Sequence, residues 1–421
     1  MLSRLLKMLK ETPASQMTQY ELKNCPKVEN SAGKNAEDVE STTTTVATYF
    51  DSKLLKLTKI AIFSRLIMCC IMFGLSTDSL QYDHSHSLVF KTIHGRLRSF
   101  INWDGIHFMT VARRGYVFEH LHCFFPLYPI CIRLAREMLR YLLMCVGVSI
   151  GIGNEFVVAA ILVNFVLFVV CVRLMMRWTA TLFQSIDFGF YSGIVMCFNP
   201  ASIFFSAVYS ETLFLYLTLL VCQQFYKAVA PERENSFGVM VYKLFPLNCV
   251  AAVASLCRSN GIFLFGFSCY VAIIYITVFS LPTKRVLVAF LFSSLPALLP
   301  VGWFYYLNSR GVGYSYLQDK YWGVGFLKYF RWQQLPNFAL ALPAVSIGLI
   351  TVYFMFKICR PLVSFVTGGS FQIVPKLATK LKVFIDHNTM IFVFPFMVHL
   401  FALIALIRIP TLYMGNYLFH L

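Results

Sequence analysis

The sequence predicts an all-α protein that crosses a membrane several times. Of its 421 residues, 58% are hydrophobic and only 13% are charged, and the mean hydropathy is +0.67. Soluble domains carry about 25% charged residues, so this chain has more apolar surface than one soluble core can bury. Several stretches also approach the roughly 20 apolar residues that a helix needs to cross a bilayer.

The apolar segments predict about 8 to 11 transmembrane helices, some of them short enough to be re-entrant or half-helices. The first is expected at 57–76. The others lie at 121–132, 141–153, 155–176, 188–209, 211–228, 244–257, 261–280, 286–307, 336–357 and 389–409.

The N-terminal part of the chain differs from the rest. Residues 1–56 are polar, which predicts a largely disordered tail before a multispanning domain at 57–421. Lys53, Lys56 and Lys59 flank the first apolar segment and favour a cytosolic N-terminus. Residues of about 77–120 are therefore expected to form a first loop on the luminal side.

The formal net charge of +17 does not indicate a nucleic-acid partner. The basic residues are spread through short loops, where they normally orient helices and meet anionic lipids. A basic luminal loop would also suit a lipid substrate that carries phosphate. No zinc-ligand spacing is present, and no metal is expected.

The polar stretch FINWDGIHFMTVARRGYVFEHLHCFFPLYP at 100–129 is the first candidate site. If it is helical, Asp104 and His107 share one face. A carboxylate at a membrane interface can take a proton from an attacking sugar hydroxyl, and the ring of Trp103 could stack on the sugar. The alternative is that Asp104 caps a short interfacial helix.

Glu119 and His120 follow in the same stretch, before a proline-containing run that breaks the helix. Glu119 could fix a sugar hydroxyl or support the base, or both residues could be ordinary exposed loop residues. Glu211 comes later, between two apolar runs. It is expected either to sit at a helix N-terminus, where the helix dipole stabilises a carboxylate, or to contact substrate.

Two further basic positions stand out. Arg258, with Asn260 in the motif RSNG, interrupts an apolar run. It must pair with a carboxylate, bind a lipid phosphate or anchor the chain at an interface. Lys320 and Arg331 lie in an aromatic-rich connection that suits either a sugar-phosphate headgroup or an interfacial belt.

Together these motifs resemble the PIG-V family, GPI mannosyltransferase 2. The matching pieces are WDGIHF…ARRGYVFEH…FFPLYP, NPASIFFSAVYSE, RSNG, and KYWGVGFLKYF followed by PNFALALP. They occur in the family's order and cover roughly residues 57–345.

The resemblance implies a multi-pass enzyme of the endoplasmic-reticulum membrane with a GT-C-type glycosyltransferase fold. Such enzymes need no cofactor and use dolichol-phosphate-mannose as donor, and this family adds the second, α-1,6-linked mannose to the GPI-anchor precursor. The acidic residue of the first luminal loop is then Asp104. Glu119, Glu211, Arg258 and Asn260 also fall on matching motif positions.

The implied reaction inverts the anomeric configuration, because a β-linked donor gives an α-linked product. One base suffices for such a single displacement, and cations steady the departing phosphate; Arg258, Lys320 and Arg331 are the candidates. The expected partners are the two lipid-linked substrates, with a small membrane subunit left open. The alternatives are a lipid transporter or flippase, another GT-C transferase, or a non-catalytic membrane subunit of GPI biosynthesis.

Overall fold

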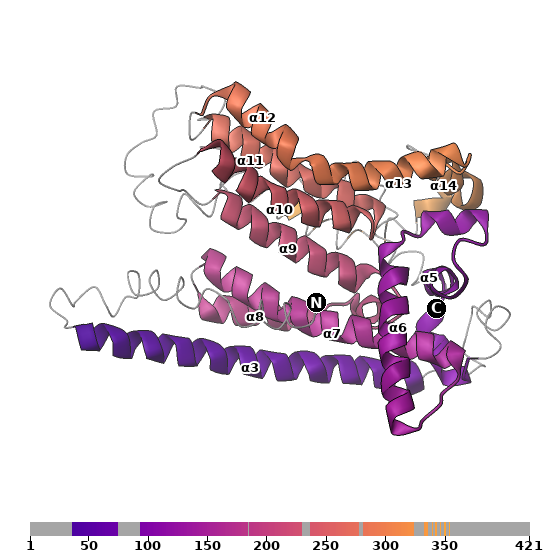
Figure 1. Ribbon diagram of the computed structural model, residues 1–421. Coiled ribbons are helices and arrows are strands. Elements are labelled where there is room, and N and C mark those ends of the chain that lie inside the picture. Colours follow the sequence, from indigo (N-terminus) through magenta and orange to yellow (C-terminus); the bar gives the residue numbers. More distant parts are fainter. Residues whose placement is uncertain are drawn as a thin grey trace. The chain divides into compact units, whose positions relative to one another are not determined.

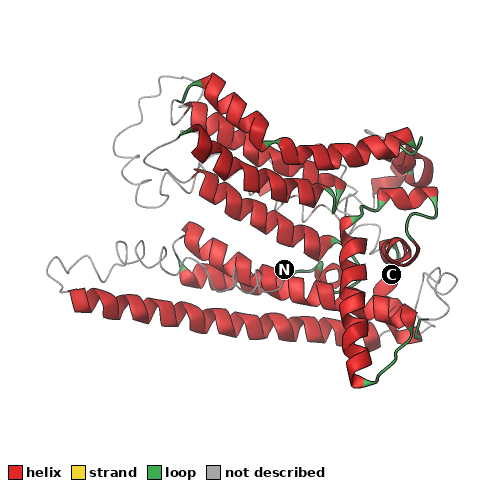
Figure 2. Cartoon of the chain, in the orientation of Figure 1, coloured by secondary structure: helices red, strands yellow, loops and turns green. Residues whose placement is uncertain are grey.

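The computed structural model describes residues 36–74, 93–183, 185–229, 236–277, 281–323 and 332–335, with single residues up to Tyr353. Every regular element in these ranges is helical (Figure 2). The prediction of an all-α protein is confirmed for this part of the chain.

Five described helical stretches are long and apolar enough to cross a membrane. They are 45–74 of α3 (Ala36–Gly74), α7 (Ile152–Phe183), α9 (Glu211–Val229), α10 (Phe237–Ser255), and 259–276, which joins η5 (Ser259–Leu264) to α11 (Phe265–Thr277). A sixth candidate is the pair α12 (Thr283–Ser293) and α13 (Leu298–Ser309), which is bent by 42° at η6 (Leu295–Ala297). The protein is therefore multispanning. The segments predicted at 336–357 and 389–409 lie almost entirely outside the described residues.

The prediction of two short spans at 121–132 and 141–153 is wrong. In their place the structure has one helix, α6 (Leu127–Val146). It carries Arg133, Arg136, Glu137 and Arg140, and these charges disfavour a transmembrane position. Ile130, Leu134, Met138 and Tyr141 recur at helical spacing and are 49–70% exposed. A helix with one charged and one apolar face is typical of an interfacial position. In Figure 1, α6 runs across the direction of α9, α10 and α11.

The first helix begins earlier than predicted. α3 starts at Ala36, inside the stretch 1–56 for which a disordered tail was predicted. Tertiary contacts explain the difference: the Tyr49 hydroxyl donates to Asp187 Oδ1 at 2.8 Å, and Lys53 Nζ lies 3.0 Å from the same atom. Phe50 and Leu54 are also buried. Composition alone does not report such contacts.

The described residues belong to two compact units. The first draws on 1–67 and 168–202, and includes α8 (Ile186–Cys197). At Gly189 a Cβ would lie 2.8 Å from the Cβ of Ala180, so glycine allows α8 to approach α7 closely. Within this unit the buried Arg65 of α3 donates to the carbonyl oxygens of Cys197, at 3.3 Å, and Ser202, at 2.8 Å.

The span predicted at 188–209 is not one helix. α8 ends at Cys197, and η4 (Ser202–Phe205) follows as a separate short element. Pro200 lacks the backbone N–H that a continuing helix needs, and the side chain of Asn199 accepts a hydrogen bond from the amide of Ala201 at 2.7 Å. These two residues end α8 and leave the following residues free to form a loop.

The second unit draws on 68–167 and 203–421. Within it, α10 packs against α9, α11 and α12 (Figure 1). The buried amide of Asn248 in α10 donates to the carbonyl of Ser293 at 3.0 Å, and the hydroxyl of Tyr275 in α11 donates to the carbonyl of Ala228 at 2.8 Å. The end of α10 meets the start of α9, and the candidate site lies there.

Candidate active site

The site begins at a strained turn before α5 (Asp104–Arg114). The amide of Gly105 donates to the carbonyl of Asn102 at 3.1 Å, which closes a four-residue turn with Trp103 and Asp104 at its centre. Trp103 has φ 50° and ψ −118°, the conformation of the first central residue of a type II′ turn. Glycine normally occupies that position. Such strain costs about 1–3 kcal/mol and clusters at functional sites.

The segment 207–210 fixes this turn from the other side. The amide of Val208 donates to the carbonyl of Phe100 at 2.9 Å, and the hydroxyl of Tyr209 donates to the carbonyl of Asn102 at 3.1 Å. A Cβ on Gly105 would lie 3.3 Å from the Val208 carbonyl oxygen, so a glycine after Asp104 permits this close approach. The motifs WDG and AVYSE are thereby held against each other.

Asn164 in turn holds the segment 207–210. It is fully buried in the middle of α7, and its amide nitrogen donates to the carbonyls of Ala207 and Tyr209 and to the hydroxyl of Tyr128. Sequence reasoning missed this residue. The available signal was a lone amide in an apolar span, a type of residue that needs a partner at that depth.

Three charged side chains form the centre of the site. Glu211, at the start of α9, accepts a short hydrogen bond from Nη1 of Arg258, which also lies 3.4 Å from the hydroxyl of Ser210. The charges of Glu211 and Arg258 both act on Asp104. Glu211 therefore lies at a helix N-terminus, and Arg258 pairs with a carboxylate; each is one of the alternatives that the sequence left open.

Asp104 itself is the carboxylate best prepared to accept a proton. Burial raises its pKa to about 6; the charge of Glu211 raises it further, whereas that of Arg258 opposes the rise. Among the described residues no side-chain hydrogen bond is made by Asp104, and α5 has no side-chain cap. The Asp104 side chain therefore does not cap α5. A carboxylate that titrates near neutral pH suits general-base work.

Gly261, the last residue of the motif RSNG, allows the tight backbone packing that positions Arg258. Arg258 precedes η5, where a Cβ on Gly261 would lie 2.5 Å from the carbonyl oxygen of Ala254 and would overlap Ser255 still more closely. Only a residue without a side chain fits there. Asn260 lies in η5 and is partly buried, and its side chain makes no hydrogen bond within the described part of the chain.

A second group gathers where α14 (Tyr314–Trp322) packs on η3 (Glu119–Cys123). Glu119 Oε2 accepts hydrogen bonds from Lys320 Nζ at 2.6 Å and from the Tyr321 hydroxyl at 2.7 Å. The hydrogen bond from Lys320 is the main reason that the pKa of Glu119 is lowered. Lys320 thus binds a carboxylate of the protein, and Oε2 of Glu119 is occupied by two donors.

His107 connects this second group to α5. Its ring stacks on Phe124 at 4.5 Å and meets the edges of His120 at 5.1 Å and Trp322 at 6.5 Å, measured between ring centroids. Burial, and then the charge of His120, lowers the pKa of His107 to about 4, so His107 is neutral at physiological pH. The helical spacing predicted for Asp104 and His107 is confirmed.

The remaining predicted residue, Arg331, lies outside the described residues. Sequence reasoning did not include Tyr321 among the site residues. Tyr321 lies 202 positions after Glu119, and its hydroxyl donates to the same carboxylate oxygen as Lys320. In the described part of the chain, no group of three His, Cys, Asp or Glu side chains is placed to hold a metal ion.

The fold is that of a multi-pass membrane protein, and its site brings two carboxylates and a guanidinium together at the ends of helices. A family model described as mannosyltransferase (PIG-V) matches residues 52–308 and 304–414. This match covers well over half of the chain. The protein belongs to the PIG-V mannosyltransferase family.

The names of similar proteins agree with this family. The chain is 28% identical to the GPI mannosyltransferase 2 of Drosophila melanogaster, over 82% of this chain and 83% of that protein. It is 28% identical to the human GPI alpha-1,6-mannosyltransferase 2, over 60% of this chain and 57% of the human protein. The Candida albicans GPI mannosyltransferase 2 is 24% identical over 72% and 80%. No solved structure matches.

These findings make the protein a glycosyltransferase, and specifically a mannosyltransferase of GPI-anchor biosynthesis. They do not favour a transporter or an accessory subunit. The match covers 57% of the human protein and 60% of the Drosophila pseudoobscura one.

Proposed function

We propose that the protein transfers mannose, in α-1,6 linkage, from dolichol-phosphate-mannose to the GPI-anchor precursor, as its second mannose. The relatives whose names specify α-1,6 transfer support the linkage. Reaction on the luminal side of the endoplasmic reticulum, with a cytosolic N-terminus, is part of the proposal. Both substrates have lipid tails and reach the site within the membrane.

The reaction is a single displacement. The acceptor hydroxyl oxygen bonds to the anomeric carbon of mannose while the bond from that carbon to the phosphate oxygen breaks. Dolichyl phosphate leaves with the electron pair of that bond, and the hydroxyl proton passes to a base. One carboxylate is enough, because no covalent sugar–enzyme intermediate forms.

Asp104 is the proposed base, and its environment is the observation that carries the proposal. It has a pKa of about 6 and no side-chain hydrogen bond within the described residues, so it can both hold and release a proton near neutral pH. Glu211 is less suited, since Arg258 neutralises its charge. Trp103 and His107 lie beside Asp104 and are proposed to contact the sugars.

Arg258 is the proposed phosphate ligand. Its Nη1 is used by Glu211 and Ser210, whereas Nε and Nη2 make no hydrogen bond within the described part of the chain. The side chain is 31% exposed. A guanidinium edge matches two phosphate oxygens. Lys320 is a weaker candidate because Glu119 already holds it.

Complementation tests the proposed function. In cells that lack the second GPI mannosyltransferase, this protein should restore GPI-anchored proteins at the surface. The one-mannose precursor should disappear at the same time. Expression at a normal level in the endoplasmic reticulum without either change would refute the proposal.

A further inference from the structure

Asn164 is a fully buried amide in the apolar helix α7. Its nitrogen donates to the hydroxyl of Tyr128 at 2.9 Å and to the carbonyls of Ala207 and Tyr209. Its own carbonyl oxygen is buried and accepts no hydrogen bond from the described residues. A buried acceptor without a partner opposes folding, so packing alone would favour an apolar residue at this position. The role of the asparagine therefore lies in the hydrogen bonds that it donates.

The first connection from this amide to the site is the segment 207–210. The hydroxyl of Tyr209 donates to the carbonyl of Asn102 at 3.1 Å, in the turn before Asp104. The same segment leads directly into Glu211 at the start of α9. Without the amide, two buried carbonyls of this segment would each lose a donor, and the segment would be free to shift against the turn.

The second connection runs through α6. Tyr128, in the first turn of α6, is fully buried, and its ring packs nearly at right angles on the ring of Phe108 in α5, at 5.3 Å between centroids. Phe108 lies four residues after Asp104 in the same helix. The hydrogen bond from Asn164 holds the hydroxyl end of Tyr128. Asn164 therefore acts on the helix of Asp104 through two separate contacts.

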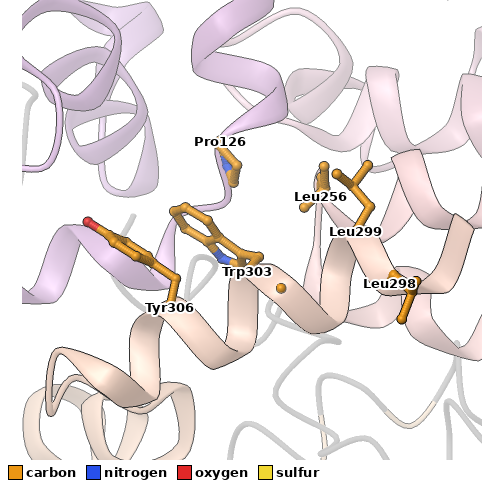
Figure 3. Close-up of a pocket in the computed structure, with 7 residues that line it drawn as sticks. Pro126, Leu256, Leu298, Leu299, Trp303 and Tyr306 are labelled. Carbon is orange, nitrogen blue, oxygen red and sulfur yellow. The ribbon is translucent and has the colours of Figure 1, made fainter.

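The start of α6 depends on this contact, because an open groove lies beside it. Pro126, the residue before α6, lines an apolar groove of about 480 Å³ together with Leu256 and residues of α13 (Figure 3). Among the described residues no charged side chain lines the groove. The amide of Leu127 donates to the carbonyl of Leu256 at 3.1 Å. The hydrogen bond from Asn164 to Tyr128 is the next polar contact along this end of α6.

We infer that Asn164 is a positioning residue for mannosyl transfer, because it holds the turn of Asp104 and the start of α9, with Glu211, at a fixed separation. The inference rests on the proposed function, since Asn164 would act through the proposed base. Burial and then the charge of Glu211 raise the pKa of Asp104 to about 6. Release of the segment 207–210 should therefore lower that pKa toward the ordinary 3.8.

Asn164→Leu tests the inference, because leucine has a similar size but donates no hydrogen bond. Asn248→Leu in α10 is the matched control. Asn248 is also fully buried, its amide donates to the carbonyl of Ser293 at 3.0 Å, and its own carbonyl oxygen also lacks a partner among the described residues.

Both variants should lower the melting temperature, but only Asn164→Leu should change the reaction. Its turnover per folded protein should fall about tenfold, and the midpoint of its pH–rate profile should move from about pH 6 to about pH 5. Asn248→Leu should leave both quantities unchanged. Equal turnover and equal midpoints for the two variants would overturn the inference.

A double variant separates positioning from an independent effect. In the Asp104→Asn background there is no base to position, so adding Asn164→Leu should lower the turnover by less than about twofold. A further loss of about tenfold would mean that Asn164 acts independently of Asp104, and would overturn the inference.

Tyr209→Phe tests the same connection with a smaller change, and it decides the matter if Asn164→Leu does not fold. It removes the hydrogen bond to Asn102 and keeps the ring. The midpoint of the pH–rate profile should again move to lower pH, and an unchanged midpoint with normal turnover would overturn the inference. Normal transfer by Asp104→Asn would contradict the proposed base, whereas normal transfer by Asn164→Leu beside an impaired Asp104→Asn would overturn the positioning role alone.

Discussion

Asp104 combines two properties that a general base needs: it is shielded enough to have a raised pKa, and it makes no side-chain hydrogen bond within the described residues. Its sequence neighbours serve this placement. Trp103 is held in a turn conformation that normally requires glycine, and Gly105 permits contact with Val208.

The transfer rate should fall as the pH is lowered through about 6. Asp104 accepts a proton only when it is ionised, and its pKa of about 6, against an ordinary 3.8, moves the loss of activity upward. Initial rates measured between about pH 5 and pH 8, with saturating substrates, would show it. A rate that stays constant down to about pH 5 would contradict the raised pKa of the base.

At position 103, glycine should give a more stable protein than alanine. Trp103→Gly and Trp103→Ala both remove the ring, so their difference isolates the backbone. Alanine normally exceeds glycine by about 0.5–1 kcal/mol, but at φ 50° and ψ −118° the order should reverse, by about 1 kcal/mol. Thermal unfolding of both variants in detergent measures it. A higher melting temperature for the alanine variant would mean that the turn is not strained.

At the scale of elements, short connections rather than long helices place the functional groups. The turn before α5, the segment 207–210 and η5 bring Asp104, Glu211 and Arg258 together, while the apolar helices provide the frame. Each connection depends on a residue with a specific steric or hydrogen-bonding role, such as Gly105, Asn164 or Gly261.

Gly261→Ala should destabilise the protein and lower transfer. The new methyl group would overlap the backbone at 254–255, and η5 would have to shift, carrying Arg258 with it. Gly266→Ala in α11 is the matched control, because a Cβ there meets nothing within 4 Å. The melting temperature and the donor KM of both variants give the comparison. Equal melting temperatures and equal donor KM values for the two variants would contradict the steric role of Gly261.

The sequence predicted much of the site at this scale, and its limits have physical causes. The motif around Asp104 and the helical spacing to His107 were visible, because both are local. The pairs Glu211–Arg258 and Glu119–Lys320 join residues that are 47 and 201 positions apart, so no local pattern reports them. The strain at Trp103 was hidden because tryptophan does not signal a positive φ.

At the scale of the whole molecule, hydropathy identified the fold class but placed several helix boundaries wrongly. The charged residues 133–140 lie between two short predicted spans, and there the chain forms the single two-faced helix α6. Asn199 and Pro200 lie inside another predicted span, and there the helix ends. The early start of α3 depends on its contacts with Asp187. Length and apolarity therefore predict that helices exist better than they predict where they begin and end.

The orientation of the chain is a prediction at this scale. Lys53, Lys56 and Lys59 lie in the N-terminal half of the first span, 45–74 of α3, and should keep the N-terminus in the cytosol. A glycosylation acceptor inserted near Ser85 should then be modified in the endoplasmic reticulum, whereas one near Lys34 should not. The reverse pattern would place the site on the wrong side for a luminal reaction.

The central claim is that Asp104 accepts the proton during mannosyl transfer. Asp104→Asn keeps the size of the side chain but cannot accept that proton. The variant should fold well: because folding raises the pKa of Asp104, the stabilising contribution of this group is present below pH 3.8 and lost as the pH rises through about 6. Asparagine removes a charge that is unfavourable at neutral pH.

The deciding measurement is the transfer of radiolabelled mannose from dolichol-phosphate-mannose to the one-mannose GPI precursor in microsomes, at matched protein levels. Asp51→Asn, at an exposed position of α3, is the control and should act normally. Asp104→Asn should lower the turnover by about 10²–10⁴-fold and leave the donor KM nearly unchanged. Near-normal turnover by Asp104→Asn would contradict the assignment of Asp104 as the base.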